Sequence, residues 1–65
     1  MTLREKAPEV GKAVRVRLSV TTAAIDEVFL GPWRAAYLEA ASETRFWRML
    51  GQSVPARDDD VWEAV

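Results

Sequence analysis

The 65-residue sequence contains neither cysteine nor histidine. The chain can therefore form no disulfide, and it lacks the side chains that most often bind zinc or serve in acid–base and nucleophilic catalysis. Its three glycines are isolated, which excludes a glycine-rich phosphate-binding loop. The consecutive carboxylates Asp58, Asp59 and Asp60 do not alternate as calcium ligands do. We expect no enzymatic activity, no metal, no cofactor and no small-molecule substrate.

Long apolar segments are absent as well. No hydrophobic run approaches the roughly 20 residues that a transmembrane helix requires. The first ten residues, MTLREKAPEV, lack the apolar core of a signal peptide. These two absences predict a cytoplasmic protein without a membrane partner.

What the chain does have is abundant apolar surface and an uneven distribution of charge. Hydrophobic residues make up 49% of the sequence and include three tryptophans. A domain this small is near the lower limit of independent stability, so burial against a second chain is expected. Residues 1–20 carry five basic and two acidic side chains, whereas residues 21–65 carry four basic and eight acidic ones. This asymmetry favours two different binding surfaces, although chance partition explains it equally well.

Periodicity divides the chain into three parts. Residues 1–12 contain Pro8 and Gly11 and predict a mobile N-terminal arm. Residues 13–50 form the core: strict alternation over 13–20 predicts a strand, and the pattern then becomes helical. Residues 51–65 predict an extended linker and an acidic C-terminal tail.

The helical part of the core divides at the Gly31–Pro32 pair. A glycine can close one helix and a proline can start the next, which predicts helices over residues 23–30 and 32–50. The second helix is apolar on two sides, with Trp33 and Trp47 in one sector and Leu38 nearly opposite. The predicted fold is mainly α with one short N-terminal strand. Because the strand has no partner strand in the sequence pattern, we expect an intertwined homodimer; the alternative is a small all-α domain.

The order of ribbon VRVRLSV, capped helix, glycine turn and longer helix resembles the ribbon-helix-helix superfamily of DNA-binding repressors and antitoxins. In that family the strands of two chains pair into a ribbon that enters the major groove. The resemblance covers residues 13–50 and implies that Arg15, Arg17 and Ser19 read bases. Pro32 and Trp33 depart from the family at the start of the second helix, where backbone amides bind a phosphate.

The acidic tail offers a second contact. Many antitoxins of this family carry an acidic C-terminal segment that folds onto a toxin, and the resemblance implies that Val61, Trp62 and Val65 would be the corresponding anchor. Alternatively, Trp62 packs on the chain's own core. The alternative function is a small non-enzymatic protein-binding modulator, such as a phage-type inhibitor or adaptor, that docks on a larger protein through its helices. The sequence pI of about 5.3 favours this alternative, because DNA binding generally needs a basic surface.

Overall fold

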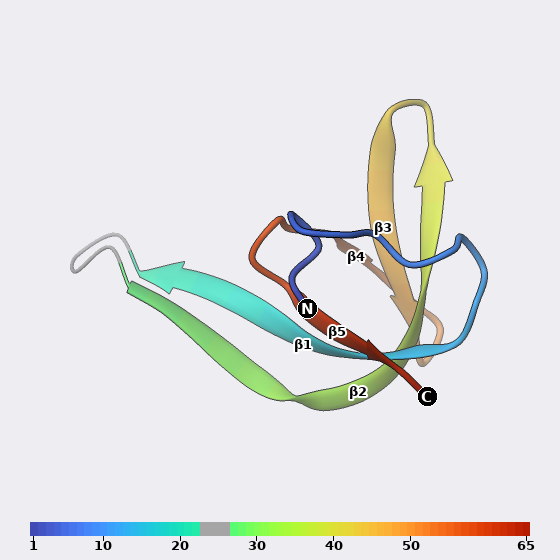
Figure 1. Ribbon diagram of the computed structural model, residues 1–65. Helices are drawn as coiled ribbons and strands as arrows, with labels where there is room; N and C mark the ends of the chain where they lie inside the picture. The colour runs from blue at the N-terminus through green and yellow to red at the C-terminus, as the bar shows by residue number, and fades with distance from the viewer. Residues whose placement is uncertain (23–26) are drawn as a thin grey trace.

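The computed structural model describes residues 1–22 and 27–65 and contains strands throughout (Figure 1). Within these residues there is no helix, and consequently none of the length and hydropathy needed to cross a membrane. One antiparallel sheet has the strand order β4-β3-β2-β1-β5. Its strands are β1 (Val14–Thr22), β2 (Glu27–Ala41), β3 (Thr44–Met49), β4 (Gln52–Pro55) and β5 (Val61–Ala64).

The predicted strand-helix-helix fold is therefore wrong, and so is the all-α alternative. The strand expected over residues 13–20 exists as β1, but the segment expected as the long helix forms most of β2 and all of β3. The short helix expected over residues 23–30 is replaced from Glu27 onward by the start of β2, and residues 23–26 lie outside the described part. The sheet also removes the argument for an intertwined dimer, since β1 pairs with β2 and β5 of its own chain.

The Gly31–Pro32 pair lies inside β2 and does not separate two helices. Arg17 pairs with Trp33 and Ser19 pairs with Leu30, so one residue of β1 faces two residues of β2. Proline has no amide hydrogen to donate to a neighbouring strand, and a bulge is where a sheet tolerates it. β2 bends sharply in Figure 1, and its two ends belong to hairpins that point in different directions.

Two tight turns connect β2 to β3 and β3 to β4. Ser42 and Glu43 have φ values of 48° and 69°, and Leu50 and Gly51 have values of 47° and 76°. Two consecutive left-handed residues are typical of the two-residue hairpin turn whose twist matches that of the flanking strands. Gly51, expected to end a helix, instead fills a position where a side chain would be strained.

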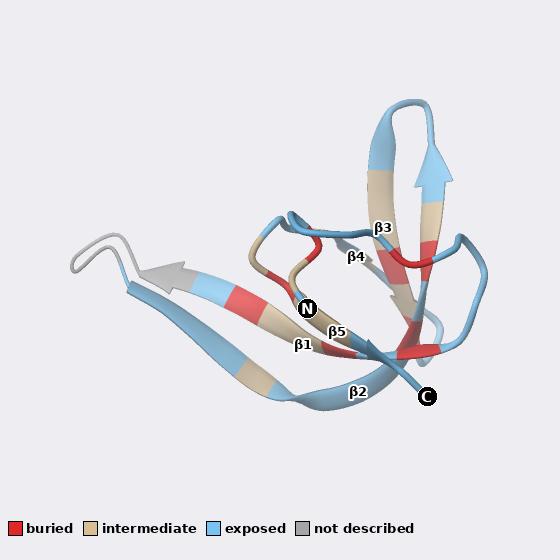
Figure 2. Cartoon of the chain, viewed as in Figure 1, coloured by how far each residue is buried: buried red, intermediate tan, exposed pale blue. Residues whose placement is uncertain are grey.

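The core lies where the strands cross, and the outer end of the β2–β3 hairpin is exposed (Figure 2). Val14 and Val16 of β1 face Ala36 and Leu38 of β2, and the Trp47 side chain of β3 is completely buried between them. The buried apolar set is Leu3, Val14, Val16, Ala36, Leu38, Trp47 and Met49. Alternation along β1 and β2 thus supplies one apolar face, as expected for a sheet with one side exposed.

The N-terminal residues 1–13 run along the end of this core. Leu3 N donates to the carbonyl of Asp60 at 2.9 Å, and Trp62 N donates to the carbonyl of Met1 at 2.8 Å. Backbone and side-chain donors of Thr2 bind Glu5 Oε1 at 2.9 and 2.8 Å, and these hydrogen bonds lower the pKa of the Glu5 carboxyl. The mobility of residues 1–12 stays a prediction. Any large movement of this segment would have to break these hydrogen bonds.

Candidate binding surface

The three residues predicted to read bases occupy two different environments. Arg15 and Arg17 project from β1 on the side opposite the core, whereas Ser19 is 5% exposed. The Ser19 amide and hydroxyl donate to Asp60 Oδ1 at 2.8 and 2.9 Å. Ser19 is therefore part of the interior, and the two arginines are left as the candidate surface residues.

Asp60 is the centre of a buried polar cluster that the sequence did not reveal. Its second oxygen, Oδ2, accepts from Trp47 Nε1 and from the Arg57 amide, both at 2.8 Å. Its side chain is 1% exposed. The neighbouring carboxylates have different partners: Asp58 lies 3.4 Å from Arg45, and Asp59 lies 3.0 Å from Arg4. The acidic run is thus three separate contacts and not one acidic site.

The outer face of β2 carries two exposed aromatic side chains. Trp33 and Tyr37 are 37% and 38% exposed, whereas Ala36 and Leu38, on either side of Tyr37, are buried. Trp33 is the register partner of Arg17, and Ala35 is the register partner of Arg15. Since opposed residues of antiparallel strands share a face, these aromatic and basic side chains form one surface.

Both arginines lie over the Trp33 ring. The guanidinium carbons of Arg15 and Arg17 are 5.0 and 5.7 Å from the ring centroid. Arg17 Nε also donates to the carbonyl of Gly31 at 2.8 Å, and Arg15 forms an ion pair with Glu63 of β5 at 2.8 Å. These contacts hold two guanidinium groups in fixed positions beside a half-exposed indole.

The same surface continues onto β3. Arg48 is the register partner of Tyr37, and it binds Ser53 Oγ at 2.8 Å and lies 3.8 Å from Glu39. We define the arginine–aromatic surface as Arg15, Arg17, Trp33, Tyr37 and Arg48. The assumed helical repeat put Trp33 in the same sector as Trp47, whereas Trp33 lies on the outer face and Trp47 in the core. The period-two pattern of Trp33, Ala35 and Tyr37 was the available signal.

The residues predicted as a tail anchor belong to β5 or follow it. Val61 pairs with Arg17 and Trp62 pairs with Val16, so their side chains lie on opposite faces of the sheet. Trp62 packs against the core cluster, and its Nε1 donates to the carbonyl of Lys6 at 2.7 Å. Val65 is 85% exposed. The structure therefore does not gather the three residues into one contact.

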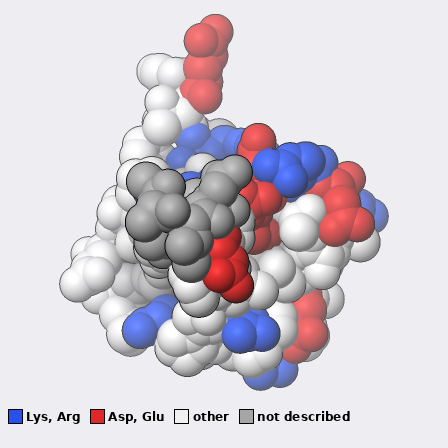
Figure 3. Space-filling model, turned by 90° about the vertical axis from the view of Figure 1, so that its left-hand side faces the viewer, with Lys and Arg blue, Asp and Glu red and all other residues white. Residues whose placement is uncertain are grey.

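Charges of both signs share one face of the molecule. On the face shown in Figure 3, basic and acidic side chains are interspersed and no large patch of one sign is visible. This agrees with a formal net charge of −1. A phosphate-binding footprint would instead gather basic side chains in one stripe or patch.

No protein-family model, no curated protein and no solved structure matches the chain.

Proposed function

We propose that this chain is a non-enzymatic protein-interaction domain that binds its partner through the arginine–aromatic surface. The ribbon-helix-helix repressor or antitoxin and the helical docking modulator both require helices, and the described residues form an all-β sheet. The observation that carries the new proposal is the pair of guanidinium groups over the exposed Trp33 ring. Tryptophan, tyrosine and arginine are the residues that most often dominate protein–protein binding energy.

The chemistry of the surface favours an acidic, apolar protein segment over a nucleic acid. Arg15 and Arg48 each have a glutamate of the same chain nearby, which neutralises part of the charge that phosphates would need. The guanidinium of Arg17 is held by a backbone carbonyl, and its positive charge is available to a carboxylate. The indole of Trp33 supplies apolar area beside that charge.

Selection from a displayed library of short peptides tests this proposal. We expect selected peptides to combine an acidic residue with an aromatic or large aliphatic one. Trp33→Ala and Arg17→Gln should each weaken binding at least tenfold, since loss of a hot-spot residue exceeds about 1.4 kcal/mol. Affinities are measured by calorimetry on variants whose thermal melting has been checked.

Arg34→Gln is the matched control, because Arg34 follows Trp33 directly and its register partner is the core residue Val16. It removes the same charge from the same strand and should leave peptide affinity unchanged. Two results would reject the proposal: equal affinity of the Trp33→Ala variant for the selected peptides, or tighter binding of an oligothymidylate at physiological salt.

The homodimer expected from the sequence also remains a proposal, and its support now comes from the β1–β2 hairpin. Among the described strands, β5 covers β1 only from Val14 to Arg17, and β3 covers β2 only from Tyr37 onward. Of the described strands, only β1 and β2 form the outer half of the hairpin. The side chains of Val20 and Phe29 in this half are 60% and 48% exposed. Such a ribbon is marginally stable alone, and its open edges can pair with a second copy.

Sedimentation equilibrium at micromolar concentration tests self-association. We expect the wild-type chain to sediment at about twice its 7.3 kDa mass and Phe29→Lys to shift it towards the monomer. Leu50→Lys, at a side chain that is 93% exposed in the β3–β4 turn, is the control and should leave the mass unchanged. A monomeric mass for the wild type over the whole concentration range would exclude this dimer.

A further inference from the structure

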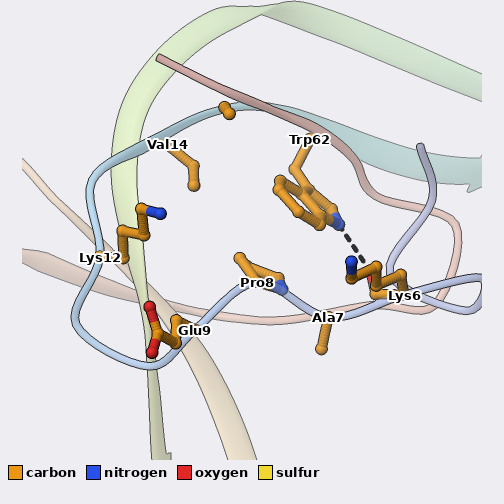
Figure 4. A pocket seen from close by; sticks show the side chains of 8 residues that line it. Lys6, Ala7, Pro8, Glu9, Lys12, Val14 and Trp62 are labelled. Atoms are coloured by element: carbon orange, nitrogen blue, oxygen red, sulfur yellow. Dashed lines mark hydrogen bonds between the residues drawn. The ribbon is translucent and has the colours of Figure 1, made fainter.

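A cavity of about 390 Å³ lies on the core side of β1 and β5, beneath the N-terminal segment (Figure 4). Val14 and the partly buried Trp62 form its apolar wall, and the buried ring of Pro8 lies beside the indole. Lys6, Lys12 and Glu9 supply its charged groups. The volume falls within the range of about 300–1,000 Å³ that is usual for small-ligand sites.

The segment that covers the cavity is anchored at both ends. Trp62 Nε1 donates to the carbonyl of Lys6 at 2.7 Å. Gly11 N donates to the carbonyl of Leu38 at 2.9 Å. Residues 6–12 therefore form an arch that is hydrogen-bonded to β5 at one end and to β2 at the other, above the cavity.

The lining has a consistent chemistry. The partly buried indole of Trp62 presents a flat apolar surface that suits a planar aromatic group. Two lysines against one glutamate leave a positive balance at the cavity, and the ion pairs found among the described residues include neither Lys6 nor Lys12. Their ammonium groups can thus bind an anionic substituent on the ligand.

We propose that this cavity binds a small aromatic carboxylate, with the ring against the Trp62 indole and the carboxylate at Lys6 and Lys12. The site is independent of the arginine–aromatic surface, because Trp62 pairs with Val16 and faces the core side of the sheet. It also gives Trp62 a binding role different from the tail anchor expected from the sequence.

Titration with indole-3-acetate, followed by ¹H–¹⁵N NMR, tests the site. The three tryptophans give three indole signals, and we expect the Trp62 signal alone to shift strongly, since Trp33 and Trp47 do not line the cavity. Neutral indole-3-acetamide should bind at least fivefold more weakly, and cationic tryptamine should not bind. Equal binding of all three compounds would overturn the role of the lysines.

Matched variants identify the residues. Lys6→Gln and Lys12→Gln should each weaken indole-3-acetate binding threefold to tenfold, and Arg34→Gln, which removes a charge from a residue that does not line the cavity, should not. Ala64→Leu places a larger side chain in the cavity wall at an exposed position and should abolish binding while the fold is retained. The proposal is rejected if the Trp62 signal does not move at millimolar ligand, or if Ala64→Leu binds as the wild type does.

Discussion

Replacing Asp60 by alanine is expected to abolish the folded state. The change removes the acceptor for four donors: the amide and hydroxyl of Ser19, the indole of Trp47 and the amide of Arg57. Each buried donor left without a partner costs about 1–3 kcal/mol. The sum is comparable to the whole stability of a small domain, about 5 kcal/mol at the low end. Thermal melting followed by far-ultraviolet circular dichroism measures the effect.

Asp60→Asn tests whether the charge and the two accepting oxygens matter, because it leaves the shape of the side chain unchanged. The amide keeps the size of the side chain but offers one accepting oxygen, so one pair of donors must face an NH₂ group. We expect this variant to be strongly destabilised, though less than the alanine variant. Asp59→Asn is the control, because its ion pair with Arg4 is largely exposed and such pairs contribute about 0–1 kcal/mol. Similar melting of the Asp59 and Asp60 variants would refute the buried cluster.

Trp47→Ala is expected to have the second-largest effect. The side chain is completely buried, and truncating a buried large aromatic costs about 3–5 kcal/mol. Trp47→Phe retains most of the apolar volume but loses the hydrogen bond to Asp60 Oδ2, so its cost should be clearly smaller. Urea denaturation of both variants gives the free energies of unfolding.

Trp33→Ala provides the comparison for Trp47. This side chain is 37% exposed and contacts two arginines on the outer face. Its loss should cost about 1 kcal/mol, the usual scale of a point substitution, because no closed cavity forms. If the Trp33 and Trp47 variants unfold at the same urea concentration, the assignment of inner and outer faces is incorrect.

The strand β1 could be predicted because its alternation is local and strict. The same reasoning failed for β2 and β3, where Trp33 and Trp47 also fit a helical repeat and no sequence signal marked the turn between the strands. Ser42 and Glu43 adopt left-handed conformations that asparagine and glycine usually occupy. The prediction that one helix would be apolar on two sides was itself a sign of error, because separate strands with inner and outer faces explain that pattern better.

The positions of the candidate surface residues were predictable only in part. Arg15 and Arg17 were correctly placed on one exposed face, because that placement depends on alternation within a single strand. Ser19 continues the same alternation, yet it is buried through a contact with Asp60, 41 residues away. Three consecutive aspartates looked like a solvated run, and no local pattern distinguishes the buried one. Contacts of this kind depend on tertiary structure.

The position of β1 between β2 and β5 has a consequence for how the chain acquires its structure. Arg15 contacts Glu63 across 48 residues, and β5 follows β1 to β4 in the order of the described strands. Non-local pairing of this kind is associated with folding in milliseconds to seconds, slower than in helical domains of similar size. A product truncated before Asp60 would lack both the edge strand and the buried acceptor, so incomplete synthesis should give an unfolded chain that proteases can remove.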